Sequence, residues 1–289
     1  MSQPPQSLTK AALWMTGWLL CMTTMAVAGR ETASKLSAFQ VMELRAFLGF
    51  IMLQPLIFAA GGYRAMKTAN IWVHVFRNGV HYSGQFAWLV AVTLIPIAQV
   101  VSIEFTMPIW VALLAVIFLG EKMSVWKIAA IILGLVGVWI IVRPGGGQAS
   151  FGQLISLYAA FAFAISVVMI RSMTRADSVT RIIFWMLIIQ GIIGLIPAIY
   201  VWRPVPLSLW PWVVLVAFVG TFSHFCLAQA LRFADSTVVV PMDFLRVPFT
   251  VLAGWLFYNE LIDIYTVIGA ILILFGNLLN LKKTGPGPK

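Results

Sequence analysis

The sequence predicts an all-α membrane protein with ten transmembrane helices, because of its composition and the length and number of its apolar runs. Of the 289 residues, 61% are hydrophobic and only 10% are charged, and the mean hydropathy is +0.97. A soluble domain carries about 25% charged residues. Apolar runs close to the roughly 20 residues that cross a hydrocarbon core recur along the chain. Alternating segments of about 10 residues, typical of barrel strands, do not occur.

Ten apolar runs can be placed in order with short connections, so consecutive helices are expected to lie antiparallel. They cover residues 11–29, 39–60, 71–94, 97–118, 125–142, 151–170, 178–201, 209–231, 236–257 and 262–281. The first run resembles a signal peptide, because Lys10 precedes it and the small residues AVA (26–28) end it. It also contains Trp14 and Trp18 and is long enough to span, so we expect it to remain as the first helix.

The basic residues predict that both termini lie in the cytoplasm. In that orientation twelve Lys and Arg residues flank the spans on the inner side and four on the outer side, as the positive-inside rule requires. Residues 1–10 and the basic tail 282–289 are then cytoplasmic segments, and the expected location is the cell inner membrane. Because most of the formal charge of +10 lies in short loops, it indicates topology and not a nucleic-acid partner.

The chain contains an internal repeat of low identity. A shift of 139 residues places Glu104 on Asp243 and Glu121 on Glu260, without a gap across three helices. Polar positions and helix boundaries agree under the same shift, which is more informative than the few identical letters.

The two repeats cover residues 11–143 and 151–281, and the loop 144–150 joins them. Each half contains five spans, and because five is odd, the second half is expected to be inverted relative to the first. Inverted repeats are a common transporter architecture, with the substrate site near the midplane between the halves. The sequence therefore predicts a transporter that works by alternating access.

Two short motifs end the repeats. The first half ends with PIWVALLAVIFLGE (108–121) and GLVGVWIIVRPG (134–145), and the second contains LAGWLFYNE (252–260), where Asn259 replaces Gly120. These motifs resemble the drug/metabolite transporter superfamily, EamA type. The resemblance implies ten helices in two five-helix repeats, both ends inside, and a central cavity surrounded by spans 1, 3, 4, 6, 8 and 9. Known members carry amino acids, nucleotide-related compounds, vitamins, siderophore-like molecules and drugs, so the motifs do not select a substrate.

The predicted helix 71–94 carries a stripe of polar side chains at spacings of three and four. The stripe consists of His74, Arg77, Asn78, His81 and Gln85. Ionisable groups at a membrane centre cost at least about 2.5–3.5 kcal/mol, so they usually face the protein interior. We expect the stripe to line a wet cavity, with structural hydrogen bonding as the alternative, and His74 to lie nearest the membrane surface. Arg77, His81 and Gln85, together with His224 at the repeat position of Gln85, are candidates for substrate binding.

Charged residues also lie in the fourth and ninth spans. Asp243 and Arg246 are three residues apart, close enough to pair on one helix, whereas Glu104 has no local partner. Arg77 is therefore the expected partner of Glu104 across the bundle. Glu104, Asp243 and Arg246 are candidates for substrate binding or proton coupling, and buried ion pairs that only fix helix packing are the alternative.

Prolines accompany both acids. Pro108 follows Glu104 by one turn, and Pro241 and Pro248 flank Asp243. Because proline lacks a backbone N–H and clashes with the preceding turn, helix kinks are expected at these three prolines.

Other polar and aromatic residues are expected to support the structure. The resemblance implies a packing or gating role for Arg45, while Glu43, two residues earlier, should face a different side. The family motif implies that Glu121 and Glu260 cap the span that follows each of them. Aromatic residues are expected mostly at lipid or at the membrane interface. Possible cavity walls are Trp14, Trp18, Tyr82, Trp110 and Tyr158.

The chain lacks the signatures of common enzymes. It has no Walker-type glycine-rich loop for ATP and no HExxH motif, and its Ser, His and Asp residues are too scattered to indicate a triad. We therefore expect no enzyme activity, no cofactor and no metal site. Without a nucleotide site, transport must use a proton gradient or substrate exchange.

The combined hypothesis is a secondary active transporter. Three arginines balance three carboxylates within the spans, and balanced charge with aromatic walls suits a small zwitterion. An amino acid or an opine-type metallophore fits this description, and export is the commoner direction in the family. The alternatives are uptake of a riboflavin-like vitamin or adenosyl compound, multidrug export, and a non-transporting membrane sensor or enzyme. The expected partners are a small-molecule substrate and the lipid bilayer; the sequence predicts no oligomeric state.

Overall fold

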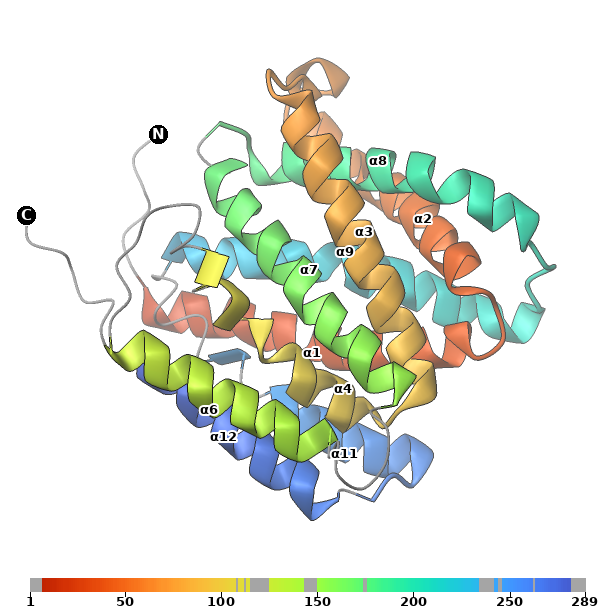
Figure 1. Ribbon diagram of the computed structural model, residues 1–289. Coiled ribbons are helices and arrows are strands. Elements are labelled where there is room, and N and C mark those ends of the chain that lie inside the picture. Colours follow the sequence, from red (N-terminus) through yellow and green to blue (C-terminus); the bar gives the residue numbers. More distant parts are fainter. Residues whose placement is uncertain are drawn as a thin grey trace, which may run out of the picture.

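All regular elements of the protein are helices in the part of the chain that the computed structural model describes (Figure 1). The described residues are 7–107, 109–111, 113–114, 125–142, 150–173, 176–233, 242–243, 246–261 and 263–281. No strand occurs in these ranges, so the all-α fold class is confirmed. The number of ten spans and the side on which the termini lie stay predictions.

Hydropathy predicted most helix ends to within a few residues. The α-helices are α1 (Leu8–Ala33), α2 (Ala38–Ala59), α3 (Ile71–Leu94), α4 (Ile97–Glu104), α6 (Val125–Val142), α7 (Phe151–Met173), α8 (Val179–Tyr200), α9 (Trp210–Phe233), α11 (Arg246–Tyr258) and α12 (Ile264–Leu281). Two 3₁₀ helices, η1 (Tyr63–Met66) and η2 (Leu207–Leu209), lie in links.

The expected span 97–118 differs from the structure, because α4 ends at Glu104 and the next two residues form a turn. The Thr106 hydroxyl donates to the carbonyl oxygen of Ile103 at 2.8 Å. A side chain that competes for a helix carbonyl in this way favours a local break in the helix.

Within the described ranges, five helical stretches are long and apolar enough to cross a membrane. They are Leu8–Ala33, Ala38–Ala59, Phe151–Ile170, Val179–Tyr200 and Leu207–Leu227. Helix α3 has a similar length of 24 residues, but its polar side chains lower its hydropathy, and most of these side chains are buried. A helix with buried ionisable groups needs protein around it and not lipid, which explains the central place of α3.

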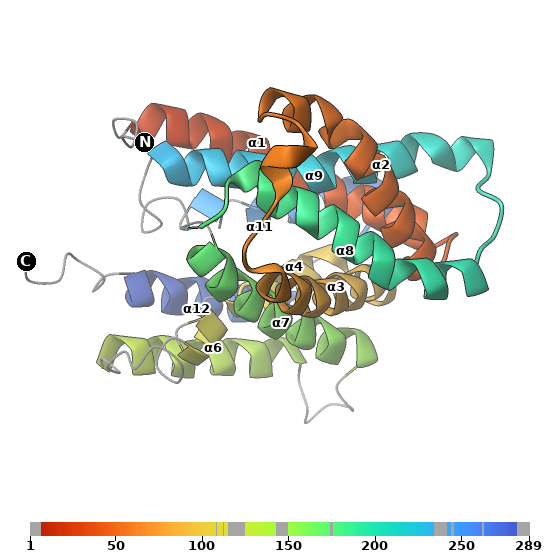
Figure 2. The ribbon, with the colours of Figure 1, turned by 90° about the horizontal axis from the view of Figure 1, so that it is seen from above.

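Helices from the two halves of the chain interleave. Helix α1 packs along α9, α3 along α7, α2 along α8 and α6 along α12 (Figures 1 and 2). Helix α1 of the first half corresponds to α7 of the second half, and α3 corresponds to α9. The α1–α9 pair is therefore the counterpart of the α7–α3 pair. The contact of α1 with α11 corresponds in the same way to that of α7 with α4. This pattern is expected when two equivalent five-helix units pack against each other, so that corresponding helices make corresponding contacts.

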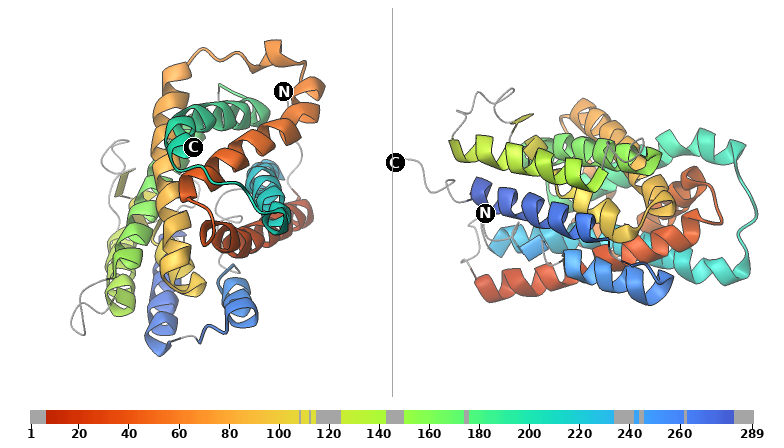
Figure 3. Two further views of the ribbon diagram at one scale, coloured as in Figure 1. Left: turned by 90° about the vertical axis from the view of Figure 1, so that its right-hand side faces the viewer. Right: turned by 60° about the horizontal axis from the view of Figure 1, so that its bottom comes forward.

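Helices α6 and α12 form a close pair at one side of the bundle (Figure 3). A β-carbon on Gly137 would lie 2.7 Å from the carbonyl oxygen of Gly269, and one on Gly269 would lie 2.5 Å from that of Gly137. Only glycine permits this approach, as at other close crossings of membrane helices. The start of α1 and the end of α12 lie toward the same end of the bundle, at the left of Figures 1 and 2.

The largest apolar core holds α1, α3 and α4 together. Its buried residues include Ala28 on α1, Trp88 and Val92 on α3, and Ile97 and Ile103 on α4. This packing fixes the polar face of α3 and the acidic end of α4 relative to each other, and so positions the site described next.

Candidate functional site

A charged triad (Glu104, Asp243 and Arg246) lies between the end of α4 and the start of α11. The Arg246 guanidinium donates to Glu104 Oε1 at 3.0 Å and to Asp243 Oδ2 at 3.2 Å. Arg246 is 3% exposed and Glu104 is 7% exposed. The predicted pairing of Asp243 with Arg246 is confirmed. The predicted pairing of Glu104 with Arg77 is wrong, because the contact of α4 with α11 brings Arg246 to Glu104 instead.

Two indoles bind the remaining oxygens of the triad. Trp88 on α3 donates to Glu104 Oε2 at 2.9 Å, and Trp18 on α1 donates to Asp243 Oδ1 at 2.6 Å. The two acids that the 139-residue shift relates therefore meet at one guanidinium, and each also accepts one indole N–H. Because two carboxylates face one guanidinium, the triad carries an excess of negative charge in a buried place.

A second polar cluster, the polar layer, connects α2, α3, α8 and α9. It consists of Arg45, Arg77, His81, Gln85, Gln190 and His224. The Nη2 atom of Arg45 on α2 donates to Gln85 Oε1 on α3 at 2.8 Å and to Gln190 Oε1 on α8 at 2.6 Å. One guanidinium thus connects three helices, which fits the packing role expected for Arg45.

Arg77 and two histidines form the rest of the polar layer. Arg77, which is 1% exposed, donates to Ser166 Oγ and to Asn78 Oδ1, both at 2.8 Å. The rings of His81 and His224 lie 5.8 Å apart, and Arg77 is near enough to act on both electrostatically. In the described part of the chain, no carboxylate forms an ion pair with either arginine of the polar layer, so this cluster carries an excess of positive charge.

Several buried polar atoms in this zone have no hydrogen-bond partner among the described residues. They are Glu43 Oε2, Arg45 Nε, Asn78 Nδ2, both ring nitrogens of His81, Tyr82 Oη, Gln190 Nε2 and Thr221 Oγ1. A buried polar atom left unpaired costs about 1–3 kcal/mol. Where many such atoms gather in one zone, water or a polar ligand is expected to satisfy them.

The predicted site residues fall into these two clusters and three separate places. The residues Glu104, Asp243 and Arg246 form the triad, and Arg77, His81, Gln85 and His224 belong to the polar layer. Trp14 packs edge-on against Phe225, and Trp110 packs in the same way against Phe161. Tyr158 is 49% exposed and shares a hydrogen bond with Ser83. The roles of Trp14, Trp110 and Tyr158 as cavity walls stay predictions.

Sequence reasoning missed Gln190, Ser166 and Trp88. Gln190 is the lone amide of the apolar span 178–201, and this signal could have found it. Ser166 and Trp88 gave no such signal, because serine and tryptophan are ordinary residues of membrane helices.

The proline and glutamate predictions have separate outcomes. Pro108, Pro241 and Glu121 lie outside the described residues. Pro248 lies within α11, and a helix kink there stays a prediction.

Glu260 caps a helix, but not the expected one. Its Oε2 accepts from the N–H of Ile97, the first residue of α4, at 3.1 Å, and its Oε1 pairs with Arg30 of α1. Asp263 caps α12 instead. The prediction that Glu260 caps the next span is therefore wrong. Asn259 adopts a left-handed φ of 50° just after α11, and the chain reversal there directs the carboxylate toward the neighbouring helix.

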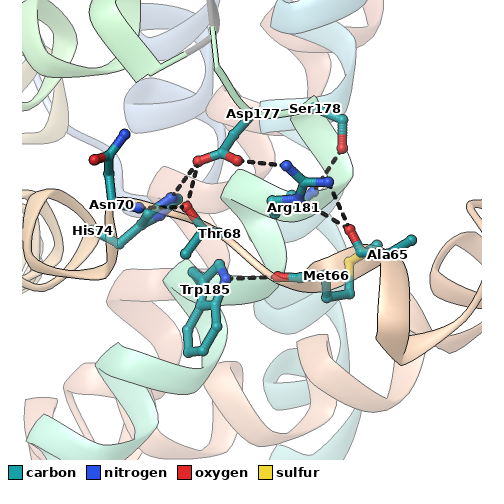
Figure 4. Close-up of polar contacts among 9 residues, drawn as sticks. All are labelled: Ala65, Met66, Thr68, Asn70, His74, Asp177, Ser178, Arg181 and Trp185. Carbon is teal, nitrogen blue, oxygen red and sulfur yellow. Dashed lines mark hydrogen bonds and ion pairs between the residues drawn. The ribbon is translucent and has the colours of Figure 1, made fainter.

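An ionic cluster outside the predicted sites joins two links at one end of the bundle (Figure 4). Asp177 Oδ2 lies 2.9 Å from the hydroxyl of Thr68 and 2.8 Å from His74 Nε2, while Oδ1 accepts from Arg181 at 2.7 Å. Arg181 also donates to the carbonyl oxygen of Ala65 at 2.8 Å. We call this cluster the Asp177 clasp (Thr68, His74, Asp177 and Arg181). His74, expected near the membrane surface, is fully buried beneath it.

The opposite end of α2 and α8 is joined by neutral contacts. Gln40 Nε2 donates to the carbonyl oxygen of Arg203 at 2.6 Å, and the backbone N–H of Arg203 donates to Gln40 Oε1 at 3.1 Å. We call this pair the Gln40 clasp (Gln40 and Arg203). Gln40 and Arg181 are each the third residue of their helix, after the N-cap residues Ser37 and Ser178. The two clasps therefore occupy equivalent places in the two halves.

A hollow of about 160 Å³ lies between α4, α11 and α12, away from the polar layer. Its lining is mainly apolar and includes Ala98, Val251 and Ala270. Sites for small molecules measure about 300–1,000 Å³, so we do not assign this hollow to a substrate. Among the described residues, no group of three or more His, Cys, Asp or Glu side chains is arranged to hold a metal ion.

Comparison with known proteins relates the chain to transporters. The model of the EamA-like transporter family matches residues 9–143 and again residues 150–282. The chain is 28% identical to a riboflavin transporter of Rhizobium johnstonii, over 96% of this chain and 93% of that protein. It is 24% identical to an S-adenosylmethionine uptake transporter of Rickettsia bellii (89% and 90% covered) and to the pseudopaline exporter CntI of Pseudomonas aeruginosa (85% and 86% covered).

A solved crystal structure shares the fold. It superposes with a TM-score of 0.67 over 95% of this chain and 97% of its own, at 18% identity. The family matches cover nearly the whole chain, and the apolar helices are those of a multi-pass membrane protein. The resemblance seen in the sequence motifs is confirmed: the chain belongs to the EamA-like transporter family of the drug/metabolite transporter superfamily.

Proposed function

We propose that this transporter exports a small zwitterionic metabolite, an amino acid or an amino-acid-derived compound of the opine type, across the inner membrane. One observation carries the proposal: the buried charge is separated into an acidic cluster and a basic cluster. The charged triad holds two carboxylates against one guanidinium. The polar layer holds two guanidinium groups that form no ion pair within the described residues.

A zwitterion offers a group of opposite charge to each cluster. Its ammonium group would contact Glu104 and Asp243, and its carboxylate would contact Arg45 and Arg77. A hydrogen bond to a charged group contributes about 1.5–3 kcal/mol. The Nε atoms of Arg45 and Arg246 have no partner within the described residues and can still donate. A hydrophobic cation would leave the two arginines of the polar layer unsatisfied, so multidrug export is less well supported.

Alternating access is proposed from the arrangement of the halves. We propose that the units 11–143 and 151–281 are inverted repeats, joined by 144–150, with both chain ends in the cytoplasm. The exchange pattern of the helix pairs supports this arrangement. The two clasps support it as well, because they join equivalent positions at opposite ends of α2 and α8. Rocking of one unit against the other would open one end at a time.

Import is a second candidate, and the name of one reported relative favours it. Two of the reported relatives are named for S-adenosylmethionine uptake and for riboflavin transport. S-adenosylmethionine has an α-amino-acid group, so the same two charged clusters would accept it. Riboflavin is not a zwitterion and would depend on aromatic contacts such as those of Trp14 and Trp18.

The test is transport by the purified protein in proteoliposomes. The panel contains a labelled α-amino acid, S-adenosylmethionine, riboflavin and a hydrophobic cation, and each is measured with and without a pH gradient. We expect transport of the first two, and the variant Glu104→Gln should reduce it by about tenfold or more, since about 1.4 kcal/mol corresponds to a factor of ten. The variant Asp263→Asn, which alters an acid at the start of α12, is the control. Transport of the hydrophobic cation alone would contradict the proposal.

A further inference from the structure

Glu43 on α2 has no cation in contact with it among the described residues, unlike the acids of the charged triad and Glu260. Glu104 and Asp243 share Arg246, and Glu260 pairs with Arg30. The Oε2 atom of Glu43 is buried and has no hydrogen-bond partner in the described part of the chain. The residue as a whole is half-buried, but a buried carboxylate oxygen without a partner is costly when the group is charged, and a proton at Oε2 would remove that cost.

Glu43 faces a small space on α8 that it shares with Tyr82 on α3. A β-carbon on Gly194 would lie 2.8 Å from Glu43 Oε2 and 2.8 Å from the hydroxyl oxygen of Tyr82. Tyr82 is 6% exposed, and its hydroxyl also lacks a partner among the described residues. Two unpartnered oxygens thus converge on Gly194, where a β-carbon would displace them. A proton on Glu43, or a water between the two oxygens, would satisfy both groups.

The acids of the charged triad are less suited to carry a proton. Each of them accepts a hydrogen bond from Arg246 and another from an indole, so an incoming proton would have to displace a partner. In the described residues Glu43 requires no such displacement, because one of its oxygens is free of partners.

The described contacts place few charged or titratable groups at Glu43. Tyr82 on α3 lies beside it over Gly194, and Arg45 on α2 is near enough to act on the same tyrosine. Arg77, His81 and His224 belong to the polar layer around Arg45. Helix α8 faces Glu43 with Gly191 and Gly194 and with no titratable side chain in the described contacts. At the end of α1, Arg30 and Glu31 are engaged by Glu260 and Tyr258. The Nη2 atom of Arg45 donates to Gln85 and Gln190, and no ion pair joins Arg45 to Glu43 among the described residues.

We propose that the Glu43 carboxyl, with the Tyr82 hydroxyl over Gly194, is the proton-carrying site that couples transport to a proton gradient. The site lies one helical turn from the Gln40 clasp along α2, so it exchanges its proton with the membrane side on which that clasp lies. Protonation removes a negative charge two residues from Arg45 and so changes the charge of the zone that binds the substrate. The inference rests on the proposed function, because it assigns the coupling step of that transporter.

The first experiment measures protonation directly and needs no substrate. Infrared difference spectra of the purified protein are recorded while the pH is raised from mildly acidic to mildly alkaline. We expect a protonated-carboxyl band that disappears in this range and that is absent from Glu43→Gln, which keeps the shape of the side chain. If the spectra of the wild type and of Glu43→Gln show the same carboxyl titration, the proposal is wrong, whatever the protein transports.

The second experiment measures coupling in proteoliposomes with a labelled α-amino acid. Glu43→Gln should lose accumulation driven by a pH gradient and keep exchange of labelled for unlabelled substrate. Glycine variants supply a matched pair: Gly194→Ala places a methyl group 2.8 Å from both oxygens, whereas a β-carbon on Gly191 meets Glu43 only at 3.8 Å. We expect Gly194→Ala to lose gradient-driven accumulation and Gly191→Ala to retain it.

The outcomes separate this inference from the proposed function. Retained proton-driven accumulation in Glu43→Gln would overturn the role of Glu43. Accumulation that depends on sodium and not on pH in the wild type would overturn it as well. If the wild type moves no zwitterion while the Glu43 band still titrates, the substrate class is wrong and the proton site stands.

Discussion

The two ends of the α2–α8 pair are closed by clasps of different chemistry. At one end Arg181, near the start of α8, binds the link after α2 and the carboxylate of Asp177. At the other end Gln40, near the start of α2, binds the backbone of Arg203, just after α8. Both clasps use the third residue of a helix, yet one is ionic and the other is neutral. Equivalent backbone positions in a repeat thus hold contacts of unequal strength.

This difference indicates which end of the pair separates more easily. The Asp177 carboxylate is 5% exposed and accepts from three side chains, so its release would leave a buried charge unpaired. Breaking a fully buried pair costs about 3–5 kcal/mol, and the 25% exposure of the Arg181 side chain lowers the cost here. The Gln40 clasp consists of two neutral hydrogen bonds, each contributing about 0.5–1.5 kcal/mol net. The end of the α2–α8 pair that the Gln40 clasp joins is therefore expected to open first. This end is also the one nearest Glu43.

Removal of the Asp177 charge should lower the free energy of unfolding more than any change to the Gln40 clasp. Asp177→Asn keeps the shape but loses the ion pair with Arg181, and we expect a loss of about 2–3 kcal/mol in the free energy of unfolding. Thermal unfolding of the purified protein in detergent measures this loss. Thr68→Val is the matched control, since it removes one neutral hydrogen bond from the same carboxylate and should cost about 1 kcal/mol. Equal losses in the two variants would contradict an ionic clasp.

Acidification should weaken the same clasp, but only at low pH. Burial alone would raise the pKa of Asp177, but the hydrogen bonds from Arg181, His74 and Thr68 outweigh burial and hold the pKa below its ordinary value of 3.8. A group with a lowered folded-state pKa stabilises fully above its unfolded-state pKa, and this stabilisation is lost as pH falls through the lower value.

The measurement is the melting temperature of the wild type and of Asp177→Asn against pH. We expect their difference to stay constant from neutral to mildly acidic pH and to shrink below the ordinary pKa of an aspartate. A difference that already shrinks near neutral pH would contradict the lowered pKa. It would also remove the contrast with Glu43, for which titration in that range is expected.

Loss of the Gln40 clasp should have the smallest effect on stability. Gln40→Leu removes two neutral hydrogen bonds, and we expect a loss of about 1–2 kcal/mol with no dependence on pH. A single cysteine placed near Arg203 should react faster with a water-soluble thiol reagent in this variant than in the wild-type background. An unchanged reaction rate would show that the Gln40 clasp does not control access at its end.

The prediction of the site from the sequence succeeded where the signal was local. The spacing of Asp243 and Arg246 on one helix predicted their ion pair, and the structure confirms it at 3.2 Å. The stripe on α3 was expected to face the protein interior, and His74, Arg77 and His81 are buried; that the stripe lines a wet cavity stays a prediction. Both inferences needed only helical spacing and the cost of polar groups in a membrane.

The predictions that failed involved contacts between distant parts of the chain. Arg77 was the expected partner of Glu104, but Arg246 and Trp88 bind that carboxylate. Glu260 was expected to cap the next helix and caps α4 instead. In each case several residues have the required chemistry, and only the packing of helices decides which of them arrives.

The sequence by itself determined that this protein is a helical membrane transporter, because hydropathy, helical spacing and the repeat motifs are properties of short stretches of chain. The tertiary structure alone decided that one guanidinium joins the two related acids, that no described cation contacts Glu43, and that the two ends of α2 and α8 are held by different contacts. Such pairings depend on which helices lie side by side, and a single sequence does not encode that choice at any one position.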